Sequence, residues 1–137
     1  MENIEIEKKL KPFLDHHPNI YIEFDEVGFC AIMNNLHPNL LGNFTGGDMA
    51  YIANAAAGLN CIVEDRVAET VSINIECLKR ARGNQLLARS KIIKAGFKLI
   101  RLRVDVYVRD KKEEELVAIA QITYSPLQDA RVKKLFE

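Results

Sequence analysis

The longest apolar segment of the chain covers residues 45–63, near its middle, and predicts a buried helix. It reads TGGDMAYIANAAAGLNCIV and leaves almost no polar face around a helix. A helix that is apolar nearly all round must be buried on most of its sides. At about 1.5 Å per residue it would run roughly 27 Å, about the width of a small domain. Thr45 and Asp48 have the spacing of a capping box, which marks the start of the helix.

Strand patterns fill the chain after this helix. In residues 70–77, 97–108 and 115–124, apolar and polar residues alternate with a period of two, which is typical of half-buried strands. The expected strands cover residues 70–77, 85–94, 97–108 and 115–124. In the first of them, the apolar face consists of Val71, Ile73, Ile75 and Cys77. In the last, it consists of Leu116, Ala118, Ala120, Ile122 and Tyr124.

The chain before the helix and the C-terminal tail carry weaker patterns. Residues 20–35 predict two strands in a hairpin or one bent strand, with Gly28 between the apolar runs. Residues 36–44 are rich in Pro, Asn and Gly and predict a loop. A short amphipathic helix is expected over 2–16 and a short helix over 127–137. The N-terminal stripe consists of Ile4, Leu10, Phe13 and Leu14, with Pro12 inside it.

One buried helix followed by antiparallel strands in hairpin order is an α+β pattern. Short connections predict that these strands are neighbours in the sheet. Because one small flat sheet cannot cover a helix that is apolar all round, the sheet must curl around it or a second subunit must cover the rest. The 137 residues fit a single domain, with 1–19 as N-terminal helix and lead-in and 126–137 as C-terminal tail.

Composition and charge narrow the function classes. Apolar residues make up 48% and charged residues 28%, and the formal net charge is zero, so no overall attraction to nucleic acid or to an anionic membrane is expected. Three cysteines without a C-x-x-C spacing argue against a disulfide framework or a zinc site, and no metal site is expected. No signal-peptide pattern and no apolar stretch of about 20 residues is visible, which predicts a cytoplasmic protein.

The segment from Asn39 to Gly47, followed by the apolar helix, resembles the hotdog thioesterases of the phenylacetate-pathway type. That family has Asn-x-x-Gly-x-x-His-Gly-Gly and a helix carboxylate seven residues past the second Gly. This chain has Thr45 in place of the His and Asn54 in place of the carboxylate. Further matches, which extend the resemblance over roughly residues 20–125, are Glu69-Thr70-Val71, Arg80–Gly83, Gly96–Lys98 and Leu116–Ala120.

The resemblance implies a hotdog fold, in which a curved antiparallel sheet of about five or six strands wraps a long central helix. It also implies an acyl-CoA substrate, no cofactor apart from the coenzyme A of that substrate, and a homodimer or a dimer of dimers. Nucleic acid and membrane are not among the expected partners.

The glycine pair at the start of the helix is the first candidate site. A helix N-terminus offers free backbone N–H groups and the positive end of the helix dipole. Gly46 and Gly47 have no Cβ, so a substrate approaches closely, and the Gly47 N–H would polarise a thioester carbonyl as an oxyanion hole. The alternative is that the two glycines only turn the chain into the helix.

Asn54 stands where the resemblance implies the general base or nucleophile. An amide takes up no proton at neutral pH, although it orients water by hydrogen bonding. The loss of a general base typically costs about 10²–10⁴-fold in rate. The alternative is an interface asparagine satisfied by backbone. Asp48 is a candidate replacement base, or else only a partner of Thr45 in the helix cap.

Other polar residues give weaker candidates. By resemblance, Asn39 and Thr70 lie near the thioester, although Asn39 also suits an Asx turn. The acids Glu64, Asp65 and Glu69 either reach a neighbouring subunit's site or form a solvated loop. The histidines and cysteines are expected to be structural: His37 in a surface loop, His16 and His17 at a helix end, and Cys30, Cys61 and Cys77 packed among apolar residues.

Residues 77–104 hold nine Lys and Arg side chains and no Asp or Glu. Such a patch suits the phosphates of coenzyme A, and we assign Arg80, Arg82 and Lys98 to it, at two turns expected to bracket a ligand channel. The alternatives are a solvated strand face balanced by acids elsewhere, or nucleic-acid binding, which the lack of aromatic residues other than Phe97 disfavours.

From these features, the first hypothesis is an acyl-CoA thioesterase-like hydrolase. The second hypothesis is a protein that binds acyl-CoA or an acyl-carrier conjugate without cleaving it. A hotdog dehydratase ranks last, because the central helix has no His for the acid–base pair of that reaction.

Overall fold

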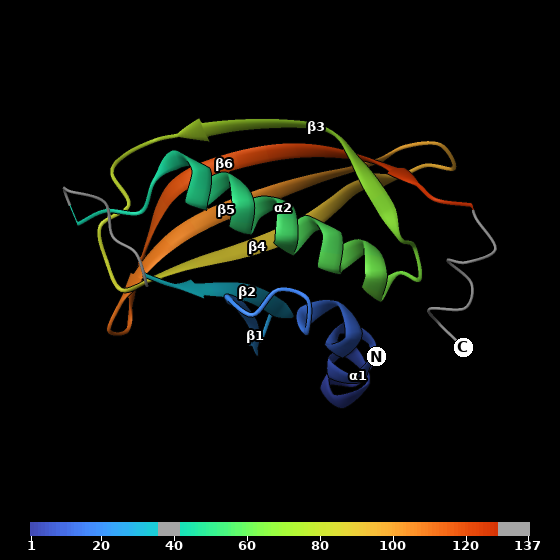
Figure 1. The fold of residues 1–137 in the computed structure, drawn as a ribbon, viewed down its shortest axis with the longest axis horizontal. Coiled ribbons are helices and arrows are strands. Elements are labelled where there is room, and N and C mark those ends of the chain that lie inside the picture. Colours follow the sequence, from blue (N-terminus) through green and yellow to red (C-terminus); the bar gives the residue numbers. More distant parts are fainter. Residues whose placement is uncertain (36–41, 129–137) are drawn as a thin grey trace.

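The computed structural model describes residues 1–35 and 42–128, which form two helices and one six-stranded sheet (Figure 1). All neighbouring strands are antiparallel, in the order β1-β2-β4-β5-β6-β3. No helix in the described part of the chain is long and apolar enough to cross a membrane. The elements are α1 (Asn3–Leu14), β1 (Ile20–Phe24), β2 (Phe29–Asn34), α2 (Gly46–Val63), β3 (Ala68–Cys77), β4 (Gln85–Ala95), β5 (Ile100–Asp110) and β6 (Glu113–Pro126).

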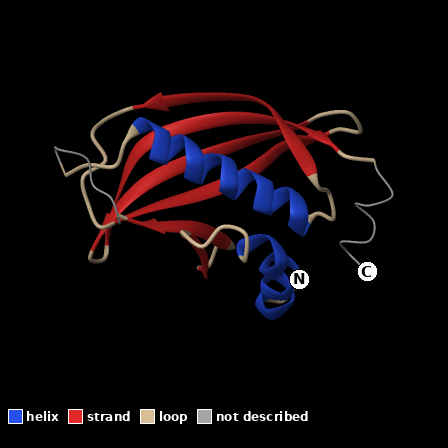
Figure 2. Ribbon diagram, in the orientation of Figure 1, coloured by secondary structure: helices blue, strands red, loops and turns tan. Residues whose placement is uncertain are grey.

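The predicted central helix is confirmed as α2, which lies across the curved sheet (Figure 2). Its buried side chains pack against inward-facing residues of the strands, such as Leu102, Val104 and Ile122. Two polar residues fix the helix on β4, because Asn60 Nδ2 donates to Ser90 Oγ at 3.0 Å and Ser90 Oγ donates to the Ala56 carbonyl at 3.1 Å. The hotdog arrangement of one long helix on a curved antiparallel sheet is therefore present.

Strands β4, β5 and β6 are neighbours in sequence order, as predicted, with one shift in register between β4 and β5 and another between β5 and β6. The period-two face of β5 points toward α2 as expected, whereas three consecutive residues of β4, Leu86, Leu87 and Ala88, are buried. In β6 a bulge opposite Val106 and Tyr107 changes which residues point inward. Val117 is fully buried and Leu116 is only half-buried, so the prediction for Leu116 is wrong.

The prediction that all strands after the helix are sequential neighbours is wrong for β3. This strand pairs with β6 at the edge of the sheet, and β4 pairs with β2 on the other side of the meander. The connection between β3 and β4 crosses near the start of α2, where the Phe44 N–H donates to the Ala81 carbonyl at 2.8 Å. Val71, at the register irregularity between Thr70 and Ser72, is 58% exposed and Ile73 is 38% exposed, so neither is half-buried as predicted.

Helix α1 covers the C-terminal part of α2. Leu10 is fully buried between them, and Lys9 Nζ donates to the Val63 carbonyl at 3.0 Å. Ile4, which the sequence placed on the apolar stripe, is 63% exposed, and Ile6 packs against the core in its place. The expected short helix over 127–137 lies largely outside the described residues.

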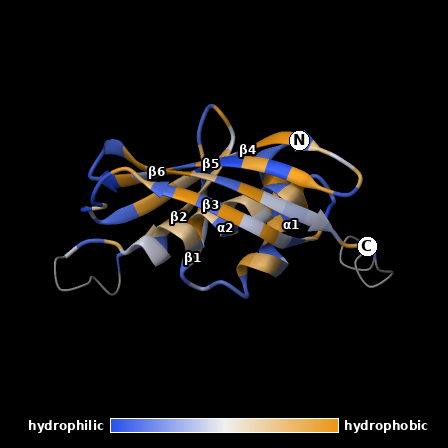
Figure 3. Ribbon diagram, turned by 90° about the horizontal axis from the view of Figure 1, so that it is seen from above, coloured by the Kyte–Doolittle hydropathy of each residue, from blue (hydrophilic) through white to orange (hydrophobic). Residues whose placement is uncertain are grey.

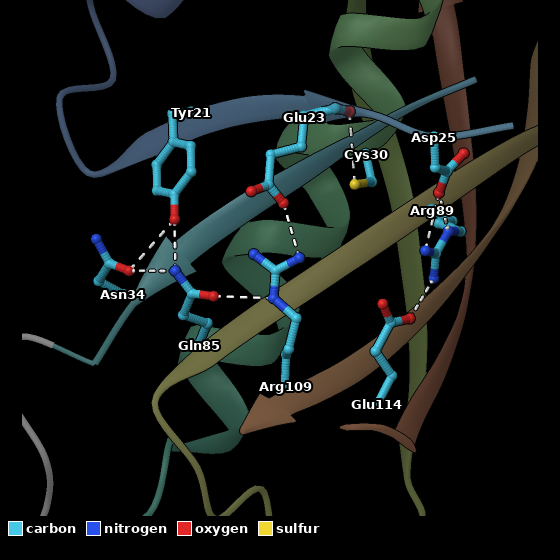
Figure 4. A network of polar contacts seen from close by, with 9 residues as sticks. All are labelled: Tyr21, Glu23, Asp25, Cys30, Asn34, Gln85, Arg89, Arg109 and Glu114. Atoms are coloured by element: carbon cyan, nitrogen blue, oxygen red, sulfur yellow. Dashed lines mark hydrogen bonds and ion pairs between the residues drawn. The ribbon is translucent and has the colours of Figure 1, made fainter. Parts of the chain in front are cut away.

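The outer face of β1, β2, β4 and β5 carries a network of ion pairs (Figure 4). Arg89 contacts Asp25 and Glu114, each at 2.9 Å, and Arg109 contacts Glu23 at 2.7 Å. Burial raises the pKa of Asp25, but hydrogen bonds from Arg89 and from two backbone N–H groups outweigh it, so the net pKa is lowered. The charged side chains of this network are therefore paired with one another on the outer face of the sheet.

Candidate active site

The start of α2 has two free backbone donors. Asp48 N–H donates to Thr45 Oγ1 at 3.0 Å, and Thr45 N–H donates to Asp48 Oδ2 at 2.9 Å, which completes a capping box. The first backbone bond of the helix runs from Met49 N–H to the Thr45 carbonyl at 3.1 Å. The N–H groups of Gly46 and Gly47 precede that bond and have no intrahelical acceptor. Asp48 is thus engaged in the cap.

Neither glycine at this tip is required by the backbone. Only Gly28 and Gly42 among the described glycines have a positive φ. A Cβ on Gly46 would meet Cys77 Sγ at 3.8 Å, and one on Gly47 would meet Thr45 Oγ1 at 3.6 Å, both ordinary contacts. A tight turn therefore does not explain the pair. What the glycines do provide is an exposed helix tip without side chains.

Asn54 is held by two side chains of the sheet. Tyr124 Oη lies 2.6 Å from Asn54 Oδ1 and 2.7 Å from its main-chain oxygen, and Thr70 Oγ1 donates to the same Oδ1 at 3.0 Å. Burial raises the pKa of Tyr124 to about 12, so its hydroxyl is a donor at neutral pH. Within residues 1–35 and 42–128, no hydrogen bond engages Asn54 Nδ2. Asn54 is therefore satisfied mainly by side chains, and its amino group remains available as a donor.

Asn54 lines a cavity of about 220 Å³ between α1, α2 and β3, which we call the α1–α2 cavity. His17 and Tyr51 also line it, with His17 Nδ1 3.3 Å from Tyr51 Oη. Its apolar walls include Phe13, Leu14, Leu59 and Ile62. Shape and lining suit an apolar chain whose polar end reaches the Asn54 amide.

Sequence reasoning missed three residues of this cavity. It assigned His17 to a helix end and counted Tyr124 only as part of an apolar strand face. Tyr51 and Asn54 are three residues apart on the helix and so share a face. Two polar side chains on one face of an otherwise apolar helix are a signal that the sequence alone could have supplied.

The predicted site residues fall into separate groups within one chain. Gly47 and Asn54 are seven residues apart on α2, which is roughly 10 Å along the helix axis. Arg82 is close to the tip, since its Nε donates to Asn43 Oδ1 at 3.3 Å. Lys98 lies in the hairpin beyond the opposite end of α2, where Arg66 Nη2 donates to the Gly96 carbonyl at 2.7 Å. One chain alone does not form the expected channel between Arg82 and Lys98.

The other candidate site residues either lie away from both groups or are not among the described residues. Asn39 and His37 are not among the described residues. Asp65 pairs with Lys9, and Glu64 and Glu69 are exposed. None of these three acids lines the α1–α2 cavity. The solvated-loop interpretation therefore fits them better than a role in this cavity.

The run of basic residues is partly neutralised by acids of other segments. Besides Arg89, Lys79 pairs with Glu115 at 2.5 Å and Arg103 pairs with Asp105 at 3.0 Å. Arg80 and Lys98 are exposed, and no ion pair in the described part of the chain involves them. The basic run is thus interrupted by paired side chains, and Arg80 and Lys98 are among its available cations.

The three cysteines differ in environment. Cys30 and Cys61 are buried, and burial raises the pKa of both thiols, that of Cys61 to about 11. Cys77 is exposed, so the expectation that it packs among apolar residues is wrong. Its Sγ is the nearest atom to a Cβ built on Gly46, which makes it a reporter of the helix tip.

We expect iodoacetamide to alkylate Cys77 of the folded protein much faster than Cys30 or Cys61. Thiolate formation and access both favour the exposed thiol. Peptide mapping by mass spectrometry after a timed reaction measures the three rates. Similar rates at all three cysteines would contradict the burial described above.

Comparisons with known proteins agree with this fold. No protein-family profile matches the chain. The medium/long-chain acyl-CoA thioesterase YigI of Salmonella typhimurium is 28% identical, in a match that covers 82% of this chain and 87% of that protein. The structure of BH2602 from Bacillus halodurans with CoA has a TM-score of 0.71 at 22% identity, covering 90% of this chain and 89% of its own.

The structure of the PaaI protein from the phenylacetic acid degradation operon of E. coli has a TM-score of 0.75 at 14% identity, covering 89% of this chain and 93% of its own. It is a protein of the type that the Asn39–Gly47 pattern resembles. The curved sheet and the central helix match the fold of these solved structures, and the similarity to an acyl-CoA thioesterase agrees with the resemblance to hotdog thioesterases in the sequence.

Proposed function

We propose that this protein hydrolyses acyl-CoA thioesters at the tip of α2. The observation that carries the proposal is the pair of exposed glycines whose backbone does not require glycine. The N–H groups of Gly46 and Gly47 are placed to donate to the carbonyl oxygen as it becomes an oxyanion, and the helix dipole adds to the stabilisation. The sequence relative named as an acyl-CoA thioesterase and the neighbour solved with CoA support the substrate class.

A complete site requires a second copy of the chain. Reacting groups must approach within about 3–3.5 Å of the thioester, and Gly47 and Asn54 of one chain are roughly 10 Å apart along α2. A twofold dimer with antiparallel central helices would place the tip of one copy beside Asn54 of the other. The same arrangement would bring the partner's Lys98 toward Arg80 and Arg82, where the three cations would hold the phosphates of coenzyme A.

Strand β3 is the edge through which we propose that the copies pair. It is ten residues long, lies at the end of the sheet and exposes Val71 and Ile73. Seen from above in Figure 3, β3 carries hydrophobic positions between hydrophilic ones. An exposed edge with free N–H and C=O groups is a template for pairing with another strand.

Val71→Lys is expected to convert the dimer to a monomer and to abolish turnover. A charge on an edge strand opposes pairing, and each monomer would have an incomplete site. Analytical ultracentrifugation and a CoA-release assay measure the two effects. Val27→Lys, at an 88% exposed position in the β1–β2 turn, is the matched control and should leave both unchanged. A dimeric, active Val71→Lys protein would contradict pairing through β3.

The direct test of the function is an assay against short, medium, long and aryl acyl-CoAs, with free thiol detected by a colorimetric reagent. We expect turnover of at least one class, lost on substitution at the tip of α2. No turnover above background at high enzyme concentration would refute the hydrolase.

One observation favours the second candidate, a protein that binds acyl-CoA without cleaving it. The helix carboxylate of the resembling family is replaced by Asn54, which has no basic atom. Calorimetry with a non-hydrolysable thioether analogue of acyl-CoA separates the candidates. Binding without turnover of the matching thioester would support this alternative.

A further inference from the structure

Thioester hydrolysis needs a group that takes a proton from the attacking water, and three nearby side chains are unsuited to this role. Asn54 has no basic atom, and its Oδ1 already accepts hydrogen bonds from Tyr124 and Thr70. The raised pKa of Tyr124, about 12, keeps its hydroxyl protonated. Asp48 is bonded to the Thr45 N–H at the tip of α2. Another residue must supply the proton acceptor.

His17 lines the same cavity as Asn54, and its main chain is fixed on both sides. Its N–H donates to the Leu14 carbonyl at 2.9 Å, and its carbonyl accepts from the Ile20 N–H at 3.0 Å. The preceding helix α1 is itself anchored on α2 through buried Leu10 and through Lys9. The imidazole is therefore held at the cavity by a rigid part of the fold.

The ring of His17 is oriented by Tyr51. His17 Nδ1 lies 3.3 Å from Tyr51 Oη, and Tyr51 lies three residues before Asn54 on the same face of α2. With its proton on Nδ1, the neutral imidazole donates to Tyr51 and leaves the lone pair of Nε2 free. A proton acceptor, an orienting hydroxyl and the Asn54 amino group then line one cavity.

Resting on the proposed function, we propose that His17 is the general base of this site, with Tyr51 as the residue that positions it. Asn54 Nδ2 donates to the oxygen of a water molecule, and Nε2 of His17 takes a proton from that water as its oxygen bonds to the thioester carbon. The tetrahedral oxyanion forms at the glycine tip of the partner copy. Its collapse breaks the C–S bond, the proton on His17 passes to the thiolate sulfur, and free coenzyme A and a carboxylic acid leave.

The test compares His17→Ala with His16→Ala in steady-state hydrolysis of the best acyl-CoA substrate. His16 is the matched control, because it precedes His17 at the same helix end and does not line the cavity. We expect His17→Ala to lower kcat by about 10²–10⁴-fold with little change in KM, as for removal of a general base. His16→Ala should match the wild-type protein. Since His17 is exposed, its truncation leaves the core intact.

Two further measurements distinguish a base from a structural residue. Added imidazole should restore part of the turnover of His17→Ala and have no effect on His16→Ala. Asn54→Asp in the His17→Ala background should also recover turnover, because it introduces a carboxylate into the same cavity. An active wild-type protein whose turnover His17→Ala leaves unchanged, or a loss that neither imidazole nor Asn54→Asp reverses, would overturn the role of His17 and leave the hydrolase standing. A wild-type protein that binds the thioether analogue but never turns over would overturn both.

Discussion

Gly47→Ala is expected to lower kcat for acyl-CoA hydrolysis by about 10²–10³-fold, the range for loss of an oxyanion-hole donor. The new methyl group would stand over the open tip of α2 and keep the thioester carbonyl from the backbone N–H groups. The fold should not suffer, because the nearest atom to the added Cβ is Thr45 Oγ1 at 3.6 Å. Alanine is also a better helix former than glycine by up to about 1 kcal/mol.

The distinguishing result is therefore opposite signs for activity and stability. Steady-state kinetics and thermal unfolding of the same preparation measure both, and a rise of a few degrees in Tm is expected. If kcat is unchanged while Tm rises, the glycines are neutral features of the turn. If Tm falls, the tip is more constrained than the Cβ contacts indicate.

The second large effect is expected at Asn54, where two substitutions should have different effects on kcat. Asn54→Ala removes the amide that donates into the cavity, and we expect kcat to fall by about 10²–10³-fold, as for loss of a positioned donor. Tyr124 keeps an acceptor, because its hydroxyl is also 2.7 Å from the Asn54 main-chain oxygen. Little loss of stability is therefore expected, and circular dichroism during thermal unfolding checks it.

Asn54→Asp has nearly the same shape and still accepts hydrogen bonds from Tyr124 and Thr70. It also adds a carboxylate that accepts a proton, so turnover at least matching the wild-type protein is expected. Unchanged kcat in Asn54→Ala would remove this residue from the chemistry. A severe loss in Asn54→Asp with an intact fold would mean that the donor is essential and that no carboxylate is tolerated.

The sequence was most informative where one periodicity applied over many residues. The apolar run of α2 has no other stable placement than a buried one, and the inward face of β5 follows from strict alternation. The position of β3 did not follow, because alternation says nothing about which strand is the neighbour. Its partner is set by the connection that crosses at Ala81, a tertiary feature.

The residues of the candidate site likewise fall into some that local sequence patterns predict and some that they do not. The helix-cap spacing and the family resemblance predict the glycine tip and Asn54 as candidate site residues. Tyr124 and His17 were not identified, because they reach Asn54 from distant parts of the chain, and no local pattern encodes such a meeting. The basic run was overestimated for a similar reason, since the acids that pair with Arg89 come from β6 and from the turn after β1.

The most direct test of the shared site is a mixed dimer of two inactive proteins, Gly47→Ala and Asn54→Ala. Unfolding and refolding them together in equal amounts should make half of the dimers mixed, and each mixed dimer would have one intact tip facing one intact Asn54. A shared site should restore about a quarter of wild-type turnover, whereas either variant refolded alone stays inactive. No recovery, with mixed dimers verified by native mass spectrometry, would contradict a site built from the helix tip of one copy and the α1–α2 cavity of the other.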